Sequence, residues 1–131
     1  MDLHLIWAAL IGAVLGSLAD WLFAGVIFHN RYQVYPEVWR TGTSERGRIA
    51  LAQALALVTS AAFVALAWKL HQTDYSGTLK LAAMIWAIGP LPLLLANALF
   101  IKIDGLVTAS HAAGWLAKLL LIAAATAWML S

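Results

Sequence analysis

The sequence predicts an all-α polytopic membrane protein: four antiparallel transmembrane helices in an up-down bundle, with an interfacial first loop. Composition is the first observation, since 63% of the 131 residues are hydrophobic and 11% are charged, against about 25% charged residues in a typical soluble domain. The length of the apolar runs is the second observation. Apolar runs of roughly twenty residues or more fill most of the chain, and a helix of that length crosses a bilayer core of about 30 Å. Inside lipid, such segments satisfy their backbone hydrogen bonds as helices, so strands are not expected.

Polar residues divide the chain into four expected helices within a single domain, residues 1–131. The expected spans are residues 3–28, 47–70, 79–103 and 106–130. The first span ends before the polar stretch His29-Asn30-Arg31. Turn residues around Gly77 precede the third, and Asp104-Gly105 forms a tight turn before the fourth. Because these two loops are short, the last three helices are expected to be antiparallel neighbours. No basic region precedes the first apolar run, which predicts a retained helix and not a cleaved signal peptide.

Basic residues are unequally distributed between the two ends of this bundle. One end carries Arg31, Arg40, Arg46, Arg48 and Lys102, and the other carries Lys69, Lys80 and the amino terminus. Because cytoplasmic loops are enriched in Lys and Arg, this bias places the first and third loops in the cytoplasm and both termini on the opposite side. The same topology explains the net charge of +2, so the expected partner is the lipid bilayer and no nucleic-acid partner is expected.

The first loop combines aromatic and charged side chains around Pro36. Its aromatic and apolar members are Tyr32, Val34, Tyr35, Val38 and Trp39, and its charged members are Arg31, Glu37 and Arg40. Aromatic and basic residues together suit the headgroup layer of a membrane. The loop is therefore interpreted as an interfacial segment that closes one end of the bundle, with a lid or a partner-docking segment as the alternative.

Four polar side chains, one on each span, fall in about the same half of the membrane. They are Asp20, Gln53, Asn97 and Lys118. Asp20 and Lys118 are full charges deep inside apolar runs, where an unpaired charge is costly and is by default a candidate functional site. We therefore expect an Asp20–Lys118 contact, with Gln53 and Asn97 supplying further hydrogen bonds. The pair either binds a solute or relays a proton, or it only fixes helix register as a structural pair; the remaining alternative is that Lys118 extends to the membrane interface without a partner.

Small residues accompany these charges on the first and last helices. Gly12, Gly16 and Asp20 recur at steps of four and share one stripe, and His111, Gly114 and Lys118 share another. Small residues on such a stripe let a neighbouring helix approach closely. Both stripes are therefore expected to face the interior of the bundle.

Further residues are candidates for the wall or gate of this site. They are Trp21, Pro90, His111 and Trp115. Trp21 and Trp115 lie at about the same membrane depth as Asp20 and Lys118 and could form a wall of the site; the alternative is that they fill the core. Pro90 lies in Gly89-Pro90-Leu91-Pro92, which is expected to break the third helix, either as a packing kink or as a cavity or hinge.

Catalytic and cofactor chemistry find little support in the sequence. The chain has no cysteine, which excludes disulfides, thiolate metal sites and cysteine catalysis. It also lacks the common hydrolase, nucleotide-binding and zinc-protease motifs, so no catalytic residue is assigned. Histidines could pair at either end, His29 with His111 or His4 with His71, but no motif supports haem or metal ligation, and no cofactor or metal is expected.

Several short motifs resemble those of a family of small four-helix bacterial inner-membrane proteins classed as a domain of unknown function. The similar stretches are Gly16 through Asp20-Trp21-Leu22-Phe23, Trp39, Asn97-Ala98-Leu99-Phe100 and Gly114-Trp115-Leu116. This resemblance covers most of the chain. It implies a multi-pass protein of the bacterial inner membrane, whose termini the charge bias then places in the periplasm. It also points to Asn97, and it implies no particular activity.

Two functions from different classes remain open. The first is a small transport or solute-binding protein, a homo-oligomer, with the intramembrane polar layer at its site. The alternative is a structural or accessory subunit of a larger membrane complex, in which the polar layer serves assembly alone.

Overall fold

The computed structural model describes residues 2–38, 42 and 44–131, and this part of the chain is helical with no strand. Four helical segments are long and apolar enough to cross a membrane, with mean hydropathies between 1.6 and 2.1. They are Leu3–Ile27, Glu45–Lys69, Tyr75–Phe100 and Gly105–Leu130. The expected fold class is therefore confirmed. The expectations for Trp39 and Arg40 lie outside the described residues, as do those for the side chains of Tyr32 and Val38.

The four spans are built from a larger number of elements. In chain order these are α1 (Leu3–Asp20), the π-helical η1 (Trp21–Ile27), α2 (His29–Gln33), the short 3-10 helix η2 (Pro36–Val38), α3 (Glu45–Lys69), α4 (Tyr75–Ile88), α5 (Pro90–Phe100) and α6 (Gly105–Leu130). The third span begins at Tyr75, earlier than the expected residue 79, because the Asp74 side chain caps it by accepting from Gly77 N at 3.1 Å.

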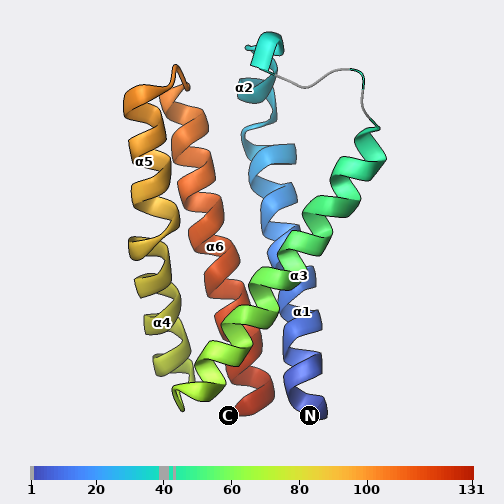
Figure 1. The fold of residues 1–131 in the computed structure, drawn as a ribbon, viewed down its shortest axis with the longest axis vertical. Helices are drawn as coiled ribbons and strands as arrows, with labels where there is room; N and C mark the ends of the chain where they lie inside the picture. The colour runs from blue at the N-terminus through green and yellow to red at the C-terminus, as the bar shows by residue number, and fades with distance from the viewer. Residues whose placement is uncertain (1, 39–41, 43) are drawn as a thin grey trace.

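Two central helices, α1 and α6, lie side by side, and the others pack around them (Figure 1). The chain termini lie at one end, which we call the terminal end; α2 and the turn between α5 and α6 lie at the other, which we call the loop end. The α4–α5 span packs against α6, and α3 crosses α1 obliquely. The main buried apolar cluster lies toward the terminal end and consists of Phe63, Ala67, Leu81, Ala82, Leu119, Ile122 and Ala123.

Helix α3 packs on the bundle along only part of its length. Its buried residues begin at Ala56 and continue to Ala67, whereas every residue from Glu45 to Leu55 is exposed. Figure 1 shows the reason: the beginning of α3 stands away from α1 at the loop end and approaches it only further along. Helix α3 is thus packed on the bundle toward the terminal end and separated from α1 at the loop end.

The close contact between α1 and α3 depends on small residues. A Cβ atom at Gly12 would clash with Ser60 Oγ, and it would also lie 3.3 Å from Ile122 Cγ2 on α6. The Ser60 hydroxyl donates across the interface to Ala9 O at 2.8 Å. Gly12 therefore allows α1 to touch both neighbours at one level, as the small-residue stripe indicated.

At the loop end, an ion pair joins α2 to the start of α6. Asp104 caps α6 by accepting from Leu106 N at 3.0 Å and Val107 N at 3.2 Å. Arg31 donates to the same carboxylate through Nε at 2.9 Å and through Nη2, and Tyr35 donates to it through its hydroxyl at 3.3 Å. The hydrogen bond from Arg31 is the main reason that the pKa of Asp104 falls to about 2.

The third span breaks where the sequence placed its prolines. Helix α4 ends at Ile88 and α5 begins at Pro90, with Gly89 between them at φ −108° and ψ −85°. Proline has no N–H to donate to the carbonyl one turn earlier, which favours a break at this point. On the α4 side, Trp86 Nε1 donates to Ala112 O on α6 at 2.8 Å and holds the two helices together.

Candidate functional site

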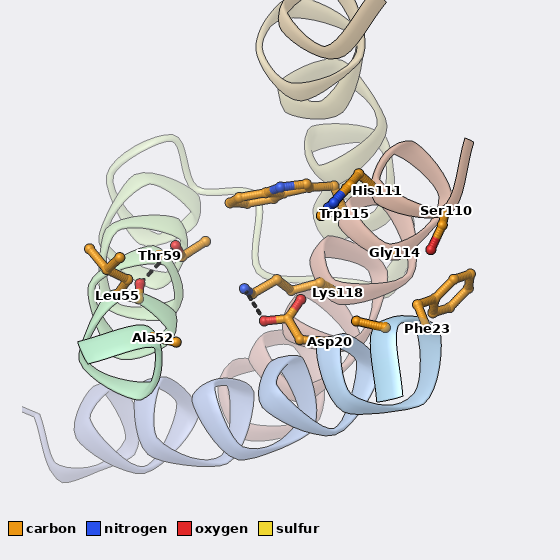
Figure 2. Close-up of a pocket in the computed structure, with 11 residues that line it drawn as sticks. Asp20, Phe23, Ala52, Leu55, Thr59, Ser110, His111, Gly114, Trp115 and Lys118 are labelled. Atoms are coloured by element: carbon orange, nitrogen blue, oxygen red, sulfur yellow. Dashed lines mark hydrogen bonds and ion pairs between the residues drawn. The ribbon is translucent and has the colours of Figure 1, made fainter. Parts of the chain in front are cut away.

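The structure brings Asp20 and Lys118 together. Lys118 Nζ lies 2.6 Å from Asp20 Oδ2, across the contact between the last residue of α1 and the middle of α6 (Figure 2). The two side chains differ in burial: that of Lys118 is 7% exposed, and that of Asp20 is 50% exposed. The amine is thus enclosed by protein, whereas the carboxylate reaches open space.

Two neighbours hold the lysine in this position. A Cβ atom at Gly16 would lie 3.1 Å from Lys118 Cγ and 3.4 Å from Lys118 Cε, so the missing side chain leaves room for the lysine stem against α1. On the other side, Lys118 Nζ lies 4.8 Å from the centroid of the Trp115 ring, within the range of a cation–π contact. The lysine therefore runs from α6 along α1 to reach the carboxylate.

The carboxylate lines a cavity of about 480 Å³ whose lining residues come from α1, η1, α3 and α6. The residues that line it are Asp20, Phe23, Ala24, Ala52, Leu55, Thr59, Ser110, His111, Gly114, Trp115 and Lys118. Figure 2 shows Leu55 and Thr59 on α3 across the gap from the ion pair. The cavity exists because the beginning of α3 diverges from α1, and its walls are mostly apolar.

Two polar atoms of the cavity are hydrogen-bond acceptors with capacity to spare. Asp20 Oδ2 accepts from Lys118, and a carboxylate has lone pairs for further hydrogen bonds on both of its oxygens. The Thr59 hydroxyl donates to Leu55 O at 3.0 Å, so its oxygen keeps its lone pairs but has used its proton. Ser110 and His111 have partners of their own. Lys118 Nζ carries three N–H donors, of which one is assigned to Asp20, so the cavity presents donors as well as acceptors to whatever enters it.

The other expected members of the polar layer do not join the pair. Gln53 is exposed, because it lies in the part of α3 that stands away from α1. Asn97 is half-buried on α5, and the described residues show no hydrogen bond from Gln53 or Asn97 to Asp20 or Lys118. Ser60, which shares a face with Gln53, is buried at the crossing of the helices instead.

The expected wall residues are divided between the cavity and other surroundings. His111 and Trp115 line it. Pro90 is half-buried at the break between α4 and α5 and is not among the lining residues. Trp21 is 62% exposed, and its ring lies over Gly25, where a Cβ atom would come within 3.1 Å of Trp21 Cδ1. Phe23, two residues further on, takes the place expected for Trp21.

Sequence reasoning missed the π-helix η1, which begins directly after Asp20. Phe28 N donates to Phe23 O at 3.0 Å, an i to i+5 bond of the wider π turn. Two residues of this segment, Phe23 and Ala24, line the cavity. Segments of π-helix occur frequently at functional sites. No residue pattern in the sequence marks this one.

Within the described part of the chain, no group of three or more His, Cys, Asp or Glu side chains is arranged to hold a metal ion. His4 and His71, the possible histidine pair near the termini, line one cavity there together with Asp2 and Trp68. Chemically, the Asp20 site offers an ion pair, spare acceptors and apolar walls. Such a site is suited to binding a small molecule or a proton.

Comparison of the chain with protein-family models, with curated proteins and with solved structures found no significant match.

Proposed function

We propose that this chain is a small integral membrane protein that binds a small solute beside Asp20 and Lys118 and carries it across the bilayer. One observation carries the proposal: a half-exposed carboxylate, whose amine partner is buried, opens into a cavity of about 480 Å³. A pair that served packing alone has no need of an open space beside it. The volume lies within the range of roughly 300–1,000 Å³ that is usual for small-molecule sites.

Flux through reconstituted protein tests this function. Proteoliposomes are assayed for movement of protons, alkali cations and small uncharged amphiphiles, and the expected flux disappears in Asp20→Asn. The matched control is Glu45→Gln, which neutralises an exposed carboxylate at the start of α3, away from the cavity. Absence of flux for every probe in the unaltered protein, or equal flux in Asp20→Asn, contradicts transport through this site.

The membrane setting belongs to the same proposal: a bacterial inner membrane, with α2 and the α5–α6 turn in the cytoplasm and both termini in the periplasm. The basic residues at the loop end support this orientation. Because the chain has no cysteine, single cysteines at Ser44 and Ser131 report the side of each position. An impermeant thiol reagent added to intact spheroplasts is expected to label Ser131→Cys only. The reverse labelling overturns the orientation, and labelling of both overturns the four-span topology.

A second function has an observation of its own. The first turns of α3, Glu45 to Leu55, are exposed on all sides and carry large apolar residues such as Leu51 and Leu55. A further membrane helix could pack there, which supports either a homo-oligomer or an accessory subunit of a larger complex. Native mass spectrometry from mild detergent distinguishes these: a multiple of the chain mass supports the homo-oligomer, and a co-purifying partner with no flux supports the accessory subunit. Membership of the small four-helix bacterial family resembled by the sequence motifs is likewise a proposal.

A further inference from the structure

We infer that the solute of the Asp20 cavity is an uncharged amphiphile: an apolar body that carries a hydrogen-bond donor such as a hydroxyl group. The inference rests on the proposed solute binding and goes further by naming the chemical class. Three properties of the cavity carry it, namely its unused acceptors, its balanced charge and its apolar walls.

The unused acceptors select for a donor. The hydrogen bond assigned to Asp20, from Lys118, uses one of its two carboxylate oxygens, and Thr59 has an oxygen whose own proton is already given to Leu55 O. A carboxylate or phosphate headgroup brings acceptors only, so it would lie against these oxygens without forming hydrogen bonds. A hydroxyl or amide headgroup can donate to these oxygens and can also accept from the Lys118 ammonium, so the groups that lose water on binding keep hydrogen-bond partners.

The balanced charge selects against a charged headgroup. Asp20 and Lys118 are the only Asp, Glu, Lys or Arg residues among the described residues that line the cavity, and they neutralise each other at 2.6 Å. An anion would meet the carboxylate before the buried amine. A cation beside the Asp20 carboxylate would also lie close to the positive charge of Lys118. It would lose its hydration, and a site without net negative charge would not compensate for that loss. A neutral donor meets neither cost.

The apolar walls select for a hydrophobic body. Phe23, Leu55 and Trp115 line the cavity, and Figure 2 shows the ion pair between Leu55 on one side and Phe23 on the other, with the Trp115 ring beside Lys118. Residues near the beginning of α3 line the cavity, and this part of α3 stands away from α1, so that its surroundings in the proposed setting are lipid. An amphiphile that enters from the bilayer can leave its tail among these side chains while its headgroup reaches Asp20.

A matched alkyl series tests the inference. The probes are radiolabelled 1-decanol, decylamine and decanoate, offered at pH 7 to the whole chain in lipid nanodiscs, with empty nanodiscs subtracted. Leu55→Trp fills the cavity, and Leu51→Trp is the control, since both leucines are about equally exposed on α3, at 60% and 62%, and only Leu55 lines the cavity. Thr59→Val removes one acceptor at constant shape and leaves the ion pair intact.

The expected result is saturable binding of 1-decanol that is about tenfold tighter than that of either charged probe. Leu55→Trp abolishes this binding, Leu51→Trp preserves it, and Thr59→Val weakens it several-fold. If decylamine or decanoate binds tighter and Leu55→Trp removes that binding, the solute class is overturned while solute binding at this cavity stands. If no probe shows binding that Leu55→Trp removes, the inference is overturned, and the flux assay decides separately whether transport through Asp20 survives.

Discussion

Unequal burial of the two charges implies that removing one costs more than removing the other. Asp20→Asn leaves the amine of Lys118 enclosed, at 7% exposure, without its counter-ion. Breaking a buried pair in this way costs about 3–5 kcal/mol. The Trp115 ring, 4.8 Å from Lys118 Nζ, remains and offsets about 1 kcal/mol of that loss. We therefore expect Asp20→Asn to lower the free energy of unfolding by about 2–4 kcal/mol.

Lys118→Met acts on the other side of the same pair. It leaves the Asp20 carboxylate without its amine partner, but this side chain is 50% exposed and so keeps access to other partners. The methionine also keeps most of the apolar stem that packs beside Gly16. We therefore expect Lys118→Met to lower the free energy of unfolding by about 1 kcal/mol, as for partly exposed ion pairs. The double variant removes both charges and is expected to be more stable than Asp20→Asn alone, because an apolar replacement of a whole pair is often neutral.

The assay is a double-mutant cycle on equilibrium unfolding in lipid bicelles, with each variant measured under the same conditions. A control cycle with Glu45→Gln and Lys69→Met, two exposed residues at opposite ends of α3, is expected to be additive. The reasoning is refuted if the costs of Asp20→Asn and Lys118→Met add in the double variant. It is also refuted if Lys118→Met is the more damaging of the two.

Three further changes probe contacts away from the pair. Gly12→Ala is expected to cost about 1–3 kcal/mol through its clash with Ser60 Oγ, and to cost less in a Ser60→Ala background; equal costs in both backgrounds contradict this contact. Trp86→Phe loses a 2.8 Å hydrogen bond to a carbonyl of α6 and is expected to cost about 1 kcal/mol, whereas Trp128→Phe, on an exposed side chain, serves as the near-neutral comparison. Asp104 has its pKa lowered from 3.8 to about 2, so its ion pair stabilises the fold fully above pH 3.8 and is lost as the pH falls toward about 2. Unfolding measured across this range is expected to lose that pH dependence in Asp104→Asn, and an unchanged profile argues against the ion pair.

The fold followed from the sequence because it depends on run length and short loops. Uninterrupted apolar stretches predicted four spans, and the structure has four at nearly the expected places. The meeting of Asp20 with Lys118 followed from depth and from the glycine stripe, because a helix rise of about 1.5 Å per residue fixes how far each side chain lies from the end of its span. Whether that meeting serves function is still a prediction.

Helix tilt is what the sequence could not supply. Residue spacing places Gln53 and Ser60 on one face of α3, which is a statement about rotation around the helix axis. It says nothing of the crossing angle with α1, and that angle separates the two residues: Ser60 is buried at the crossing and Gln53 is exposed beyond it. The pairing of Arg31 with Asp104 was missed for a related reason, because it depends on how a loop folds back over the bundle end.

The ion pair also contributes to the shape of the cavity that it lines. Helices α1 and α3 touch where Gly12 meets Ser60, and a helix tilted about that contact separates from its neighbour with distance along the axis. One turn beyond the contact, the space beside Gly16 is taken by the stem of Lys118 from α6. Asp20 holds the amine in that position. The carboxylate that lines the cavity therefore also keeps the lysine stem against α1, so the ion pair and the cavity beside it belong to one arrangement of side chains.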